Sequence, residues 1–129
     1  MGQKQSGFTL IELISVLVIL GILASVAVPK FINLSAEAQQ VATNSIAKSI
    51  ESGSSLNHAV DIAKEAAIST DTPIAVDNCN DGGSLLADGL PANYSITAGA
   101  VGDKATANCT LTRTGTAETA TFAIIGVVP

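Results

Sequence analysis

The chain has 129 residues, about the length of one domain, and its composition restricts what that domain can be. Hydrophobic residues make up 47% but aromatic residues only 3%, so any core must be built from aliphatic side chains. Six basic and eleven acidic residues give a net charge of -5, which argues against nucleic acid as a partner because phosphate binding needs clustered Lys and Arg. One His and two Cys exclude a His-rich or Cys-rich metal site. We therefore expect a structural or assembly protein without a cofactor, and not an enzyme.

An apolar segment, residues 8–29, follows a short polar leader that contains Lys4. As a helix this segment would extend ~33 Å, enough to cross the hydrocarbon core of a bilayer. It fits a secretory signal peptide cut near Ala27, a retained membrane anchor, or a helix that stays in lipid only temporarily. Its single charged residue, Glu12, favours the third interpretation, because a carboxylate inside a membrane costs ~2.5–3.5 kcal/mol near the centre. Glu12 therefore predicts a partner group.

The junction between the leader and the apolar segment resembles the processing site of type IV pilins. The matching residues are Gly7-Phe8-Thr9-Leu10-Ile11-Glu12. In that family the leader is cut after the Gly on the cytoplasmic side, and the new N-terminal Phe is N-methylated. The short leader is similar to that of type IVa prepilins, and residues 29–34 are similar to the mannose-sensitive haemagglutinin pilins. The specific resemblance covers roughly residues 1–40.

The resemblance implies an α+β pilin fold, in which a long N-terminal helix packs on a small antiparallel β-sheet head. It implies three parts: a cleaved leader (1–7), a transmembrane and filament-core helix (8–29) and an exported head (30–129). A prepilin peptidase would cut after Gly7, and inner-membrane assembly machinery would polymerise the subunits into a helical homopolymer. The bacterial protein would thus pass from the inner membrane to an extracellular pilus used for adhesion, with motility as a further role. A pseudopilin of the type II secretion apparatus, a minor pilin and a membrane-anchored binding domain that does not polymerise remain as alternatives.

Four residues of the apolar segment have predicted roles in the assembly of subunits. Cleavage would leave Phe8 with a charged amine, and in a stack of parallel helices Glu12 of one subunit can pair with the Phe8 amine of a neighbour. Such a buried pair sets the register between subunits, because a wrong offset leaves a charge unpaired. Gly21 and Pro29 disfavour a helix interior by ~1 and ~3 kcal/mol relative to Ala. We expect the segment between them to be the weakest part of the helix and to stretch in an assembled filament.

The apolar segment is followed by residues with helical periodicity, which predict one long helix from about Phe8 into the 60s. The expected core-facing stripe consists of Leu34, Ala38, Val41, Ala42, Ile46, Ile50, Leu56, Val60, Ala63 and Ala67. Gly53 falls on this stripe and is either a close-packing site or the end of a first helix. His58 lies off the stripe, where we expect a solvated side chain rather than a ligand.

After Pro73 the sequence becomes rich in β-branched residues and turn signals. The expected strands are 74–77, 93–98, 105–113 and 118–127, and the last two form an antiparallel hairpin around Gly115. Residues 78–89 are expected to form a loop. Three acidic residues, Asp77, Asp81 and Asp88, could serve a Ca²⁺ ion, but their spacing matches no EF-hand and favours turn chemistry.

The two cysteines, Cys79 and Cys109, should form a disulfide if the head is exported into an oxidising compartment. In the chain-entropy model such a bond stabilises a small head by ~3–4 kcal/mol. By resemblance, residues 79–109 would form the variable surface of the head. No nucleophile elbow, P-loop, dinucleotide motif or zinc spacing is present in the sequence.

Overall fold

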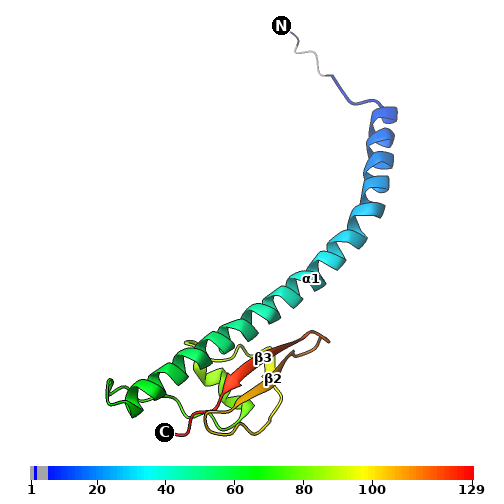
Figure 1. Cartoon of the computed structure of the whole chain (residues 1–129). Helices are drawn as coiled ribbons and strands as arrows, with labels where there is room; N and C mark the ends of the chain where they lie inside the picture. Colours follow the sequence, from blue (N-terminus) through cyan, green and yellow to red (C-terminus); the bar gives the residue numbers. More distant parts are fainter. Residues whose placement is uncertain (1, 3–5) are drawn as a thin grey trace. The chain divides into compact units, whose positions relative to one another are not determined.

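A computed structural model describes residue 2 and residues 6–129, without the side chains of residues 28–34. Lys4 of the predicted leader and the side chain of Leu34 lie outside the described residues. The chain forms two compact units, Met1–Glu37 and Ala38–Pro129, and the second unit is called the head from here on. In chain order the elements are α1 (Leu10–Glu65), the 3₁₀ helix η1 (Cys79–Leu85), β1 (Tyr94–Ile96), β2 (Thr106–Arg113) and β3 (Thr119–Ile125) (Figure 1). A long apolar N-terminal helix and a small antiparallel sheet confirm the expected α+β class.

Helix α1 runs for 56 residues, which confirms the single long helix expected from the sequence. Gly21, Pro29 and Gly53 all lie within it, so none of them ends the helix. Beyond Glu65, the N–H groups of Ile68 and Ser69 both donate to the carbonyl of Ala63, at 2.9 and 3.2 Å. These bonds satisfy a carbonyl in the last turn of the helix, where intrahelical partners run out.

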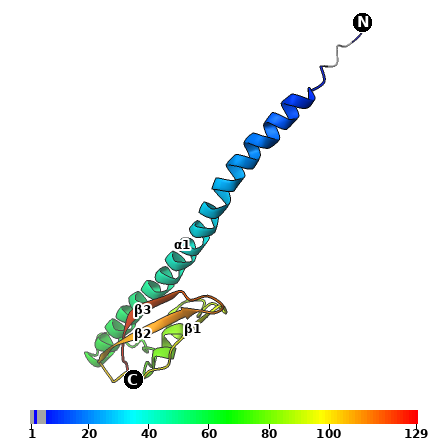
Figure 2. The same cartoon turned by 90° about the vertical axis from the view of Figure 1, so that its right-hand side faces the viewer.

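The three strands form one sheet in the order β1-β2-β3, with both neighbouring pairs antiparallel (Figure 2). Strands β2 and β3 form the expected hairpin, with Gly115 in its turn at a φ of +86°. The expected strand 74–77 is wrong: only Val76 pairs there, in a single bridge to Val127. The physical reason lies at Ile74, whose N–H and C=O both bond to the side chain of Asn57, at 2.7 and 2.8 Å. That backbone is therefore used by α1 rather than by a neighbouring strand.

The core lies between α1, the sheet and η1. Alternate residues of β3 point into it, because successive side chains of a strand face opposite sides. Its largest fully buried side chains include Phe122, Ile124 and Leu111 from the sheet and Ile50 from α1. Helix η1 contributes Gly82, where an added Cβ would lie 3.0 Å from Ile50 and 3.3 Å from Phe122. Helix η1 therefore packs closely against α1 and β3 at Gly82, where a larger side chain would be crowded.

The buried face of α1 differs from the expected apolar stripe. Of the expected residues with a described side chain, only Ile50 is fully buried, and Val41 and Leu56 are 63% and 69% exposed. Ile46, Val60 and Ala63 are half-buried, and Ala38, Ala42 and Ala67 are exposed. The residues that do face the core recur at steps of three and four and are mostly polar: Thr43, Ala47, Ile50, Ser54, Asn57 and Asp61.

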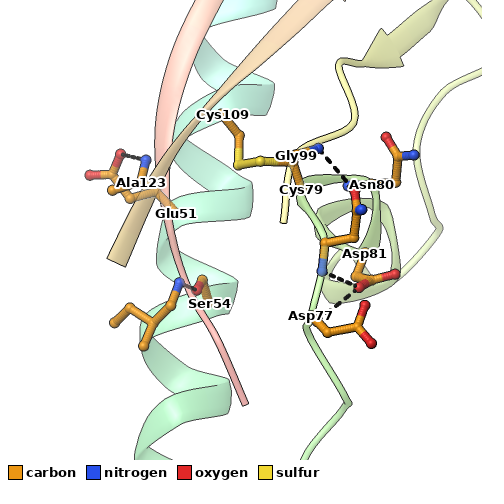
Figure 3. The surroundings of a disulfide bond; sticks show 11 residues. Glu51, Ser54, Asp77, Cys79, Asn80, Asp81, Gly99, Cys109 and Ala123 are labelled. Atoms are coloured by element: carbon orange, nitrogen blue, oxygen red, sulfur yellow. Dashed lines mark hydrogen bonds between the residues drawn. A yellow bond between two sulfur atoms is a disulfide. The ribbon is translucent and has the colours of Figure 1, made fainter. Parts of the chain in front are cut away.

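Part of this polar character follows from backbone groups outside α1 that need hydrogen-bond partners. Asn57 bonds to the backbone of Ile74, and Ser54 and two half-buried residues beside the buried face bond to the outer edge of β3. Ser54 Oγ accepts the Ile125 N–H at 2.8 Å, and Glu51 Oε2 accepts the Ala123 N–H at 3.2 Å (Figure 3). One further bond joins Gln40 Nε2 to the Thr119 carbonyl at 3.0 Å. Apolar side chains at these helix positions would have left the strand edge unpaired.

The expected loop 78–89 contains η1, which a capping box starts. Asn78 Oδ1 accepts the Asn80 N–H, and Asp81 Oδ2 accepts the N–H groups of Asn78 and Asp77 at 2.9 and 3.1 Å. Asp81 therefore performs the turn chemistry that the sequence favoured. Cys79, the first residue of η1, is joined to Cys109 of β2 with their Cα atoms 5.7 Å apart, which ties η1 to the sheet (Figure 3).

We predict that Gly53→Ala destabilises the head. In an open helix this change would stabilise by ~1 kcal/mol, but here the new Cβ would lie 2.9 Å from the Leu85 carbonyl oxygen. Overpacking of this kind typically costs ~1–3 kcal/mol. Chemical denaturation of the full chain in detergent micelles should give a net loss of roughly 1 kcal/mol. Ser52→Ala, at the exposed neighbouring position, is the control and should be neutral or slightly stabilising. A Gly53→Ala chain as stable as the Ser52→Ala chain would contradict this.

We also predict that Glu51 makes the stability of the head depend on pH. The Ala123 N–H and then Lys48 hold the pKa of the Glu51 carboxyl below its usual value of 4.5. A lowered pKa in the folded state stabilises at pH values above the unfolded pKa, and this contribution is lost as pH falls through the folded pKa. Glu51→Gln should therefore flatten the fall in unfolding free energy below about pH 4.5, whereas Asp88→Asn, at an exposed position, should not. Equal acid profiles for the unaltered and Glu51→Gln chains would refute this role.

Candidate processing and assembly site

The predicted cleavage junction lies in non-helical chain just before α1. Residues 6–9 have no regular secondary structure and are exposed, with Phe8 93% exposed. An added Cβ on Gly7 would meet no atom within 4 Å. The Gly7–Phe8 bond therefore lies in exposed, non-helical chain, where its backbone is accessible.

Glu12 lies within the first turn of α1, where it closes a capping box with Thr9. Glu12 Oε2 accepts the Thr9 N–H at 2.9 Å, and the Glu12 N–H donates to Thr9 Oγ1 at 3.3 Å. The helix N-terminus also carries partial positive charge, so a carboxylate is favoured there. Sequence reasoning identified Glu12 but missed Thr9, although Thr-x-x-Glu before an apolar run is the sequence signature of this box. Ser6, Gly7, Phe8 and Glu12 surround one shallow hollow, so the junction and the carboxylate are neighbours.

The segment Leu10–Ala27 of α1 is long and apolar enough to cross a membrane, with a mean hydropathy of 2.7. None of it is buried, and its large apolar side chains are at least half exposed. Its two serines do not leave free hydroxyl groups: Ser15 donates to the Ile11 carbonyl at 2.8 Å and Ser25 to the Ile22 carbonyl at 2.7 Å. Internal hydrogen bonding of this kind is what a segment in lipid requires.

Gly21 and Pro29, the two residues expected to weaken the helix, both lie within α1. Gly21 lies in open surroundings, where an added Cβ would meet no atom within 4 Å. Pro29 lies within α1, among the residues whose side chains are not described. The segment 21–29 is helical in this structure, and its stretching in a filament remains a prediction.

The described residues contain no group of three or more His, Cys, Asp or Glu side chains that could hold a metal ion. The expectation of a solvated His58 is wrong in part. The residue is half-buried, and its Nδ1 is shielded from solvent without a hydrogen-bond partner among the described residues.

Comparison with known proteins agrees with the N-terminal part of this description. Residues 2–28 match the prokaryotic N-terminal methylation motif. The chain is 44% identical over 50 residues to the type IV narrow pilus major component PilA5 of Thermus thermophilus, which is 39% of this chain and 43% of that protein. No solved structure gives a significant match. The likeness to mannose-sensitive haemagglutinin pilins is not confirmed. The match spans less than half the length of this curated relative. The chain thus carries the prepilin methylation motif and is similar to a type IV pilin through part of its length.

Proposed function

We propose that the protein is the structural subunit of a type IV pilus. The observation that carries this proposal is the exposed Gly7–Phe8 junction placed directly before a helix of membrane-spanning length. The methylation motif over residues 2–28 supports it, as does the partial likeness to a pilus major component. In this proposal the precursor is held in the inner membrane, a prepilin peptidase cuts after Gly7, and Phe8 becomes the N-methylated terminus.

The exposed apolar side chains of Leu10–Ala27 support polymerisation through the helix. Such a surface is stable only in lipid or against other apolar helices. Helices that leave a membrane for a filament core exchange one apolar environment for another, so packing and polar pairing must direct their association. Glu12 supplies the pairing in this proposal, through the Phe8 amine of a neighbouring subunit. Subunits of residues 8–129 then form a homopolymer at the cell surface, which serves adhesion and motility.

The first test is the intact mass and the N-terminal fragment spectrum of protein sheared from cell surfaces. We expect a chain that begins at N-methylated Phe8 and is two hydrogens lighter through the Cys79–Cys109 bond. A chain that begins near Val28 would mean conventional signal-peptide cleavage and would end the proposal. Protein that is correctly cut but absent from sheared surface filaments would instead support a pseudopilin.

The second test is substitution of Glu12, with filaments counted by electron microscopy. Glu12→Gln can still accept the Thr9 N–H but cannot pair with an amine as an anion, because only the carboxylate is charged. If the charge pair directs assembly, both Glu12→Gln and Glu12→Ala should lower the amount of filament at least tenfold, roughly the effect of losing a charge pair worth ~1.4 kcal/mol or more. Glu37→Gln, at an exposed position outside the apolar span, is the control. Normal filaments in both Glu12 variants would remove Glu12 from the assembly mechanism.

A further inference from the structure

The carboxylate of Glu12 has a partner within its own subunit. Its Oε2 accepts the Thr9 N–H at 2.9 Å, while Thr9 Oγ1 accepts the Glu12 N–H at 3.3 Å. We propose that Thr9 is a positioning residue, which holds the Glu12 carboxylate at the start of α1 before any neighbouring subunit arrives. This inference rests on the proposed function, because it gives Glu12 its orientation for subunit pairing.

The need for such a device follows from the start of the helix. The first intrahelical bond here joins the Leu13 N–H to the Thr9 carbonyl at 3.2 Å, so the N–H of Glu12 has no backbone partner. In a bilayer an unsatisfied N–H and an unpaired carboxylate are both costly. The Thr9 hydroxyl satisfies the first, and the Thr9 N–H pairs with the second. One residue therefore serves both groups.

The box also survives the cut that the proposed function requires. Thr9 and Glu12 both lie after Gly7, so removal of the leader leaves their two bonds in place. The cut creates a charged amine on Phe8, which borders the same hollow as Glu12. A carboxylate has two oxygens, and the box uses Oε2, so Oε1 can accept an amine without the box opening.

The consequence for assembly is pre-organisation. A flexible Glu side chain loses rotamer freedom when it is fixed by a partner, which weakens the association by that amount. Thr9 fixes the side chain in the free subunit, so the neighbour's amine meets a carboxylate that is already oriented. If Glu12 were oriented only by the neighbour, Thr9 could be replaced by any residue of the same shape.

Hydrogen exchange tests the box directly. The ¹⁵N-labelled full precursor would be studied in dodecylphosphocholine micelles, together with Thr9→Val, Thr9→Ser and Glu12→Ala. Thr9→Val keeps the branched shape but lacks the hydroxyl, so the Glu12 amide should exchange about five- to tenfold faster, as expected for loss of a helix cap. Thr9→Ser should exchange like the unaltered chain. Glu12→Ala should expose the Thr9 amide to a similar extent. Ser15→Ala, which removes another hydroxyl bond of the same helix, should leave both amides unchanged.

Filament yield tests the positioning role. Thr9→Val should form several-fold fewer filaments than the unaltered chain although the leader is still cut, and Thr9→Ser should restore them. Equal Glu12 exchange rates in the unaltered and Thr9→Val chains, or equal filament yields, would overturn the inference. The micelle measurement uses neither a peptidase nor a neighbour. If the unaltered chain shows the protection but never forms filaments, the proposed pilus function fails and the capping box stands.

Discussion

The head depends on one constraint: the outer edge of β3 must find hydrogen-bond partners away from the sheet. Strands β1 and β2 lie on the other side of β3, so its outward N–H groups face α1. Ser54 and Glu51 accept two of them, and Gln40 donates to a carbonyl of the same strand. An exposed strand edge is also a template for unwanted pairing with other chains. The helix therefore does in this small sheet what a further strand would do in a larger one.

The same requirement explains what sequence reasoning could and could not predict. The length of α1, the β2–β3 hairpin and the cysteine pair follow from local signals: helical spacing, a Gly turn between Thr-rich runs, and the count of cysteines. The buried face of α1 does not, because periodicity analysis assumes that a core-facing position is apolar. At Ser54 and Asn57 the neighbours are backbone groups of distant residues, and no local pattern identifies those neighbours.

The candidate site rests on a different kind of sequence signal, and the roles of its residues remain predictions. A processing motif must be read by an enzyme as a linear segment, so Gly7, Phe8 and Glu12 are visible in the sequence itself. The capping role of Thr9 was not predicted because the helix was expected to begin at about Phe8, which would place Thr9 inside it, whereas α1 begins at Leu10. The N-terminal and C-terminal parts of α1 also differ in where their polar side chains form hydrogen bonds. Between residues 9 and 27 the side-chain bonds stay within the helix, whereas between residues 40 and 57 several reach the sheet and the loops.

Besides stabilising the fold, the disulfide determines how the chain responds to a pulling force. Cys79 and Cys109 are 30 positions apart, and the bond between them is a covalent shortcut along the chain. If the two ends of the chain are pulled, force passes through the sulfur atoms and bypasses the intervening segment, which includes β1. At ~3.4 Å for each extended residue, about 100 Å of chain cannot be drawn out even when every other contact has broken. The segment between the cysteines carries no tension, so under load its conformation is set by its own contacts alone.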